Sequence, residues 1–430
     1  MIKILEYDEA SEDEILARAP AVVGEDVTAA VAEILRDVRD NGDAALLKYC
    51  EKFDGARLTS LEATPEEMEQ AEREVSPDFL RVLTRAADNI RRFHERQLRE
   101  GFILTDEAGL TVGQRVIPLE CAGIYVPGGR AAYPSTVLMN VIPAKVAGCE
   151  EVIVVTPPRP DGTVAPAVLA AARIAGTNQV FKIGGAQAVA ALAWGTETVP
   201  KVDKIVGPGN VYVAEAKRQV FGVVDIDMIA GPSEILIVAD GPSDPRWVAA
   251  DLLSQAEHDP MASAVLITDS PLLARAVQAE VEAQLSCLDR EEIARASIEA
   301  NGKVIVAPSL EVAVELANKL APEHLELCVE DPFAWLGRVR NAGSVFLGRH
   351  CPEALGDYLA GPNHTLPTGG TARFASPLSV DDFVKKSQFI HCSPQAIEAM
   401  AEDVATFARQ EGLTAHAASA LIRVEGRTSR

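Results

Sequence analysis

The chain has 430 residues, and its content of 48% hydrophobic and 24% charged residues is typical of a folded globular protein. That length exceeds the roughly 250–300 residues at which a single hydrophobic core stops growing, so we expect two or more domains. The formal net charge of −23 disfavours nucleic acid and anionic membranes as partners.

The sequence predicts neither a membrane span nor a secretory leader. No apolar stretch approaches the roughly 18 residues that a membrane-spanning helix needs, and the first residues, MIKILEYDEASEDE, lack the basic and apolar regions of a signal peptide. The seven cysteines are odd in number and form no CxxC pair, which argues against a disulfide framework or a thiolate zinc knuckle. We therefore expect a cytoplasmic protein.

Helices are predicted from residue 1 to about residue 110, where AAVAEILRDVRDNGDAALLKYCEKF and SPDFLRVLTRAADNIRRFHERQL place apolar residues at helical spacing. From about residue 120, short apolar runs alternate with helical segments; the runs are EVIVVTPP, QVFKIGG, VDKIVGPG and SEILIVADG. Uninterrupted Val and Ile runs are typical of strands buried on both faces. The alternation therefore predicts a parallel sheet with crossover helices.

The same alternation begins again after Asp240, with strands predicted at ASAVLITD, KVIVAPS and SVFLG. We therefore expect two similar α/β units. A loop segment rich in Gly and Pro follows from about residue 348 to residue 380. The tail, PQAIEAMAEDVATFARQEGLTAHAASALIRV, is predicted to form two helices that are broken near Gly412.

Two short motifs combine histidine with polar partners. In SQAEHDP, Gln255 and His258 are three residues apart at the end of a helix, so they share a face and offer oxygen and nitrogen ligands to a metal. The alternative is a helix C-terminus that carries a favourable histidine. In APEHLEL, His324 has the chemistry of a general base and Glu323 that of a water-activating carboxylate. Adjacent residues of a strand point to opposite faces, so this pair shares a site only if the backbone bends, and a solvated turn is the alternative.

Two further motifs lie toward the C-terminus. In GDYLAGPNHTLPT, Asp357 could bind a metal and His364 could make a polar contact, although ordinary turn chemistry explains each of them equally well. In QEGLTAHAAS, Glu411 and His416 are five residues apart, about 140° around a straight helix, so only the break at Gly412 lets both point one way. The alternative is an exposed helix start.

A glycine-rich turn, GPGN at 207–210, lies between a predicted strand and a helix, and two further glycine-rich turns occur at GGAQA (184–188) and YVPGGR (125–130). Such turns suit phosphate groups, because backbone N–H groups point outward at a helix N-terminus. None of them is a GxGxxG fingerprint, since Tyr212 occupies the third glycine position after Gly207 and Gly209. Ordinary tight turns are the alternative.

Taken together, the segments resemble the histidinol dehydrogenase family from about residue 25 to the end. The resemblance is carried by YVPGGRAAYPSTVLMN, GGAQAVAALAWGT, KIVGPGNVYVAEAKR, IDMIAGPSEILIVAD, LLSQAEHDP, LAPEHLEL, GDYLAGPNHTLPT and GLTAHAAS. It implies an α/β fold with two incomplete Rossmann-like parallel-sheet domains and smaller helical N-terminal and C-terminal parts. We expect an N-terminal helical segment at 1–112, partly packed with the second α/β unit, an NAD-binding domain at 113–240, a zinc and catalytic domain at 241–380, and a C-terminal arm at 381–430.

The resemblance also implies a function in histidine biosynthesis: a zinc-containing, NAD-dependent alcohol and aldehyde dehydrogenase that oxidises L-histidinol to L-histidine through L-histidinaldehyde. It implies a homodimer in which the C-terminal arm completes the partner's site, and one zinc ion per subunit. The site residues that it implies are Glu323 and His324 for catalysis; Gln255, His258, Asp357 and His416 for zinc; Ser233, His364 and Glu411, with His324 and the zinc ligands, for substrate; and Tyr125, Gln187 and Asn210 for NAD.

Two other functions are consistent with the residues alone. One is a zinc hydrolase with Glu323 as general base, and the other is a ligand-binding α/β protein with a structural metal. Cys351 could form a thiohemiacetal with an aldehyde, but the family's reaction scheme needs no thiol.

Overall fold

The computed structural model describes residues 1–8, 12–18, 24–128 and 132–425. It divides the chain into two compact units. The first comprises Met1–Gln97 and Leu119–Phe383, and the second comprises Leu98–Pro118 and Val384–Arg430. No helix of the described residues is long and apolar enough to cross a membrane.

One lobe of the first unit, the five-stranded lobe, is built on a parallel sheet with the strand order β6-β5-β4-β7-β8. Its strands are β4 (Cys121–Tyr125), β5 (Glu151–Val155), β6 (Gln179–Phe181), β7 (Lys204–Val206) and β8 (Asp225–Ile226). Its helices are α5 (Pro134–Ala147), α6 (Pro166–Ala175), α7 (Gly185–Trp194) and α8 (Val211–Val220). Strands β4, β5 and β7 are almost wholly buried, which explains the apolar runs seen in the sequence at β5 and β7.

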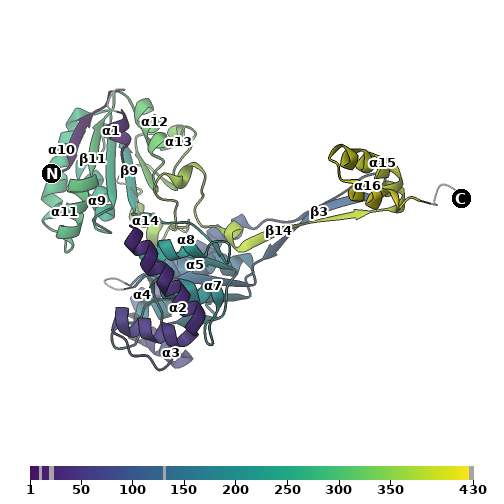
Figure 1. Cartoon of the computed structure of the whole chain (residues 1–430). Helices are drawn as coiled ribbons and strands as arrows, with labels where there is room; N and C mark the ends of the chain where they lie inside the picture. The colour runs from purple at the N-terminus through teal and green to yellow at the C-terminus, as the bar shows by residue number, and fades with distance from the viewer. Residues whose placement is uncertain (9–11, 19–23, 129–131, 426–430) are drawn as a thin grey trace. The chain divides into compact units, whose positions relative to one another are not determined.

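The other lobe of the first unit, the six-stranded lobe, also has a fully parallel sheet, with the order β1-β11-β10-β9-β12-β13. Its strands are β1 (Lys3–Glu6), β9 (Glu234–Ala239), β10 (Ser263–Thr268), β11 (Lys303–Val306), β12 (His324–Cys328) and β13 (Ser344–Leu347). Its helices are α9 (Pro245–Ala256), α10 (Pro271–Leu285), α11 (Glu291–Asn301), α12 (Leu310–Leu320), α13 (Pro332–Leu336) and α14 (Glu353–Tyr358). Apart from β1, both lobes order their strands third, second, first, fourth, fifth, so the prediction of two similar α/β units is confirmed. Figure 1 shows helices α9, α10 and α11 beside strands β9 and β11 of the six-stranded lobe.

At the carboxyl edge of the six-stranded sheet, Asp240 follows β9 at the point where the strand order reverses. Arg349 Nη2 donates to both of its carboxylate oxygens at 2.6 Å, and the backbone N–H of Glu330 donates to one of them at 3.0 Å. Glu330 follows β12 and Arg349 follows β13. The Asp240 carboxylate therefore links the carboxyl end of β9 to the segments that follow β12 and β13.

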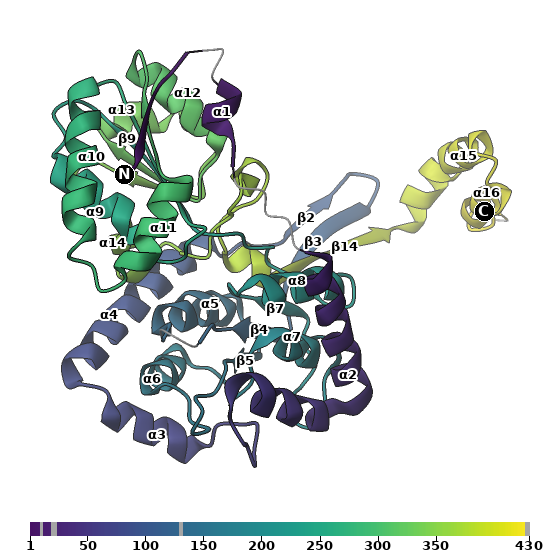
Figure 2. The same cartoon turned by 60° about the vertical axis from the view of Figure 1, so that its left-hand side comes forward.

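The N-terminal part is mainly helical, as predicted, with α1 (Glu12–Leu16), α2 (Glu25–Tyr49), α3 (Pro65–Glu74) and α4 (Pro77–His94). Helix α2 packs against α7 and α8 of the five-stranded lobe (Figure 2). The prediction missed β1, whose four residues are too few to show a period; it pairs with β11 from Lys3 opposite Lys303.

The second unit combines an antiparallel sheet of order β14-β3-β2 with two C-terminal helices. These elements are β2 (Phe102–Thr105), β3 (Leu110–Pro118), β14 (Val384–Cys392), α15 (Pro394–Gln410) and α16 (Thr414–Leu421). The expectation that residues 1 to about 110 and the C-terminal arm are wholly helical was therefore wrong for these strands. The predicted helix break is confirmed, because Gly412 has φ 75° between α15 and α16. The four-part division of the chain stays a prediction.

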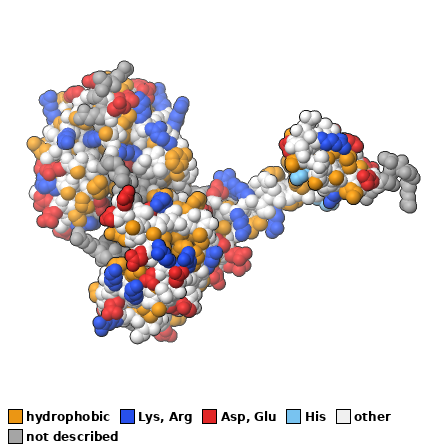
Figure 3. Space-filling model, in the orientation of Figure 1, with side chains coloured by type: hydrophobic (Ala, Val, Ile, Leu, Met, Phe, Trp, Pro, Cys, Tyr) orange, Lys and Arg blue, Asp and Glu red, His pale blue; other side chains and the backbone are white. Residues whose placement is uncertain are grey.

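The second unit has a small apolar core, and several of its large apolar side chains are exposed. Its buried apolar cluster consists of Ala405, Ala408 and Ala417, with Leu421 packed against it. Large apolar side chains remain exposed around it, and charged side chains lie between them (Figure 3); they include Phe102, Ile103, Leu104, Ile390, Phe407 and Ile422.

Candidate active site

A pocket of about 1300 Å³ lies within the first unit, between its two lobes. Tyr125 at the end of β4 and Gly207 just after β7 bring the carboxyl edge of the five-stranded sheet to one wall. Ser233 just before β9 and His324 at the start of β12 bring the amino edge of the six-stranded sheet to the other. The carboxyl edge of an open α/β sheet is where ligands normally bind, so the first wall is the one expected to hold a cofactor.

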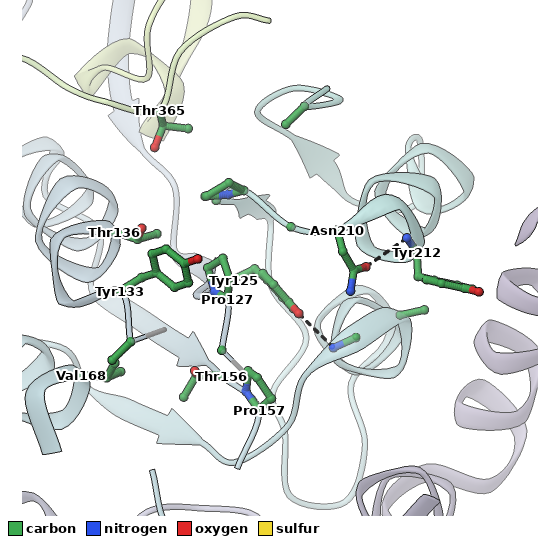
Figure 4. Close-up of a pocket in the computed structure, with 18 of the residues that line it drawn as sticks. Tyr125, Pro127, Tyr133, Thr136, Thr156, Pro157, Val168, Asn210, Tyr212 and Thr365 are labelled. Atoms are coloured by element: carbon green, nitrogen blue, oxygen red, sulfur yellow. Dashed lines mark hydrogen bonds between the residues drawn. The ribbon is translucent and has the colours of Figure 1, made fainter. Parts of the chain in front are cut away.

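The three predicted cofactor residues, Tyr125, Gln187 and Asn210, all line the pocket, and Figure 4 shows Tyr125 and Asn210. The hydroxyl of Tyr125 accepts a hydrogen bond of 3.0 Å from the backbone N–H of Gly185, the first residue of α7. Asn210 caps α8, because its Oδ1 accepts hydrogen bonds from the N–H groups of Tyr212 at 3.0 Å and Val213 at 3.2 Å. Gln187 is buried in the first turn of α7. The wall therefore presents the N-termini of two helices, which carry positive partial charge.

A buried ion pair fixes the turn between β7 and α8. Lys217 and Asp227 pair with each other although both side chains are almost fully buried. Lys217 also donates to the carbonyl of Gly207 at 3.0 Å, and Asp227 accepts from its N–H at 2.8 Å. Gly207 has φ 110°, and a Cβ there would lie 2.2 Å from the carbonyl oxygen of Tyr125, so only glycine fits. Of the YVPGGR motif, Gly129 and Arg130 lie outside the described residues.

The catalytic pair of the prediction lies on the opposite wall. His324 is 4% exposed, and its Nδ1 lies 3.0 Å from the carbonyl oxygen of Glu234. A carbonyl accepts only from an N–H, so Nδ1 carries the proton, and Nε2, which has no hydrogen-bond partner, keeps its lone pair. Burial lowers the pKa of His324 to about 4, so the ring is neutral at pH 7.

Glu323 lies beside His324, with its Oε2 at 3.7 Å from the imidazole Nδ1. Oε2 accepts a hydrogen bond of 2.9 Å from the backbone N–H of Glu234. Burial raises the pKa of Glu323 well above its usual range, and the nearby carboxylate of Glu234 adds to the rise. The two adjacent residues share one site: Glu323 lies in a bend directly before β12, and both side chains line the pocket.

Two carboxyl groups from α14 face Nε2 of His324. Glu353 Oε1 lies 3.8 Å from it and Asp357 Oδ1 lies 3.9 Å from it. Burial raises the pKa of Glu353 to about 8 and that of Asp357 to about 6. In the part of the chain that the structure describes, neither forms an ion pair with lysine or arginine. A buried acidic cluster of this kind suits a bound cation.

The other predicted metal and substrate residues of the first unit also line the pocket: Ser233, Gln255, His258 and His364. Gln255 is 1% exposed, and its Oε1 has no hydrogen-bond partner among the described residues. His364 Nδ1 lies 3.8 Å from Asp357 Oδ1. An orphaned amide oxygen beside carboxylates and imidazoles offers the nitrogen and oxygen donors that zinc accepts, so these residues fit a zinc site.

Glu411 and His416 lie in the second unit, where Glu411 caps the C-terminus of α15 and His416 lies on α16. Both side chains are exposed. Their roles stay predictions.

Sequence reasoning missed two residues of this site. Glu353 is four residues before Asp357 on α14, a spacing that puts both on one face, so helical periodicity could have found it. Glu234 holds both Glu323 and His324 through its backbone atoms, which carry no signal in the side-chain pattern.

Comparisons with known proteins agree on one family. A family model described as histidinol dehydrogenase matches residues 18–424. The chain is 56% identical to the histidinol dehydrogenase of Syntrophotalea carbinolica, over 99% of this chain and 100% of that protein. It is 55% identical to that of Geobacillus kaustophilus, over 92% and 93% of the two chains. The crystal structure of histidinol dehydrogenase from Elizabethkingia anophelis matches with a TM-score of 0.95 and 38% identity, covering 100% of this chain and 99% of that one.

Proposed function

The chain belongs to the histidinol dehydrogenase family, oxidoreductases of histidine biosynthesis, and we propose that it oxidises L-histidinol to L-histidine in two successive NAD-dependent steps through L-histidinaldehyde. The observation that carries the proposal is the neutral His324, whose free Nε2 faces a pocket with helix N-termini on the opposite wall. Under this proposal, a base and a surface suited to a dinucleotide face the same pocket.

NAD is proposed to bind the five-stranded lobe. The strand order third, second, first, fourth, fifth matches the beginning of the dinucleotide-binding fold, in which ligands lie where the order reverses. That point is between β4 and β7, where Tyr125 and Gly207 lie. Gln187 and Asn210 are proposed to contact the cofactor at the starts of α7 and α8. When bound, the nicotinamide accepts the hydride.

Zinc, one ion per subunit, is proposed to be held by Gln255, His258 and Asp357, with His416 supplied by the partner subunit of a homodimer. The orphaned Oε1 of Gln255 and the unpaired acidic cluster support this assignment. When bound, zinc would orient the amine and imidazole of the substrate. Ser233, His364 and Glu411 are proposed to contact the substrate as well.

In the alcohol step, His324 Nε2 is proposed to remove the hydroxyl proton, because loss of that proton lets hydride leave the carbon. The hydrogen bond from Nδ1–H to the carbonyl of Glu234 holds the ring in the tautomer that this step needs.

In the aldehyde step, water must add to the carbonyl before a second hydride can leave. Glu323 is proposed to take the proton from that water, with His324 assisting again. No thiol is assigned to the step: Cys351 is absent from the pocket lining, and burial raises the pKa of its thiol, which disfavours the reactive thiolate.

Mixing the protein with histidinol, NAD and zinc is expected to produce two NADH for each histidinol consumed, measured by absorbance. Removing the metal with a chelator should abolish NADH formation, and adding zinc should restore it, because the cation neutralises a buried acidic cluster. Histidinol-independent hydrolysis without NADH would support a zinc hydrolase with Glu323 as base. Metal-dependent folding without turnover would support a ligand-binding protein.

Glu323→Gln is expected to slow aldehyde oxidation far more than alcohol oxidation, since only the second step needs activated water. The glutamine carbonyl can still accept the hydrogen bond from Glu234, so the wall keeps its shape. A stopped-flow trace should show one NADH formed per site in a single turnover and then a stall. Equal slowing of both steps would contradict this division of roles.

A further inference from the structure

We propose that Arg18 is a positioning residue for the catalytic pair Glu323–His324, acting through Glu234 and the end of α12. The inference rests on the proposed function, because it assigns Arg18 to the same reaction. Arg18 does not line the pocket, so any effect on turnover must pass through other residues.

Glu234 is the residue through which Arg18 reaches the site. As shown above, the backbone N–H of Glu234 holds the Glu323 carboxylate and its carbonyl sets the tautomer of His324. Its side chain is 12% exposed, and Arg18 Nη1 lies 3.4 Å from its Oε1. Any displacement of Glu234 would therefore move both catalytic side chains together.

Arg18 also holds the segment that leads into the catalytic pair. Its Nη2 donates to the carbonyl of Leu320, the last residue of α12. The next residue, Ala321, has φ 48° and is the one non-glycine residue with positive φ in the described ranges. Such a conformation costs energy and persists only where the surroundings enforce it. Arg18 thus bridges the two segments, β9 and the α12–β12 turn, whose relative position sets the geometry of the pair.

The charge of Arg18 matters as well as its contacts. Glu234 Oε2 has no hydrogen-bond partner, and burial raises the pKa of this carboxyl group while Arg18 opposes the rise. Arg18 is the one cationic side chain ion-paired with Glu234 among the residues described. Without it, a buried carboxylate would stand uncompensated beside Glu323, and such a group forces its surroundings to rearrange or to take up a proton.

The test is a set of variants assayed for kcat and KM with histidinol and with L-histidinaldehyde. Arg18→Met should lower kcat by about 10- to 100-fold, the size that a small misplacement of catalytic groups produces, while both KM values stay within about twofold. Arg18→Lys should recover part of the loss, because it keeps the charge. The double variant Arg18→Met/Glu234→Gln should be more active than Arg18→Met alone, because no uncompensated carboxylate remains.

Arg295→Met is the matched control. Arg295 is similarly half-buried, 34% against 28% exposed, and pairs with Glu282 and Glu291 outside the pocket. It should lose some thermal stability and keep kcat. If Arg18→Met does not fold, Arg18→Lys and the double variant are compared with the unmodified protein instead.

Wild-type kcat in Arg18→Met, a rise in KM without loss of kcat, or multiplicative losses in the double variant would each overturn the proposal. An equal loss of kcat in Arg295→Met would also overturn it, since the effect would then be general destabilisation. Failure of the proposed function is distinguishable, because the unmodified protein would then form no NADH from histidinol.

Discussion

His324→Ala is expected to slow histidinol oxidation by about 10²- to 10⁴-fold, the usual cost of losing a positioned acid–base group, while the zinc content stays unchanged. His324 is a buried imidazole whose Nε2 has no hydrogen-bond partner and faces the carboxyl groups of Glu353 and Asp357 at the pocket wall. It is absent from the proposed ligand set. Steady-state rates and metal analysis of the same preparation check both parts of this result.

His94→Ala is the matched control for that variant. His94 is as deeply buried as His324, with 0% exposure, but it bonds to Gln97 and Asn363 and does not line the pocket. Its loss should lower thermal stability and leave kcat near that of the unmodified protein. Full activity in His324→Ala, or loss of zinc from it, would refute the assignment of His324 as base.

Two inactive variants, His324→Ala and His416→Ala, are expected to restore activity to each other when they are mixed and allowed to exchange subunits. The second unit buries few apolar side chains and exposes many, so it needs another surface to pack against. If that surface belongs to the partner, each site takes His324 from one chain and His416 from the other. A mixed dimer then has one site with both lesions and one with neither, and its activity should be half that of the unmodified dimer.

The exchange must be verified independently, for example by two affinity tags on the two variants. Purified mixed dimers that remain inactive would show that the second unit serves its own chain. Activity in either parent variant alone would instead remove His416 or His324 from the site.

The sequence predicted the parts of this fold that are buried and long. Strand β9 has a continuous apolar run because both of its faces are covered. Strand β4 was missed, because Gly123 interrupts its run; the glycine is needed where Leu192 and Val202 approach closely. Strand β14 was missed because most of its side chains are exposed, so no alternation marks it, and its partner β3 lies far away in the chain.

The site could be predicted from the sequence only by considering whole motifs together. Each of Gln255, His258, Asp357 and His364 has an ordinary structural explanation on its own. Only the resemblance of all the motifs together to one family favoured the functional interpretation. The side-chain pattern could not reveal the groups that hold the site residues in place. The backbone of Glu234 reaches His324, and the guanidinium of Arg18 reaches Glu234, only through tertiary packing. No periodic pattern in the sequence marks either residue.

The carboxylate of Asp240 and its partner Arg349 bear on the timing of the reaction. They lie at the carboxyl edge of the six-stranded sheet where the strand order reverses, which is the position that in the five-stranded lobe opens onto the pocket at Tyr125 and Gly207. Under the proposed function, the five-stranded lobe is the cofactor-binding wall, and both hydrides would leave across it. The first reduced cofactor would then have to depart and a fresh one arrive while the aldehyde stays in place. The wall formed by the six-stranded lobe would then have to keep the reactive aldehyde bound between the two steps. How long the aldehyde stays bound would matter more than the rate of either hydride transfer.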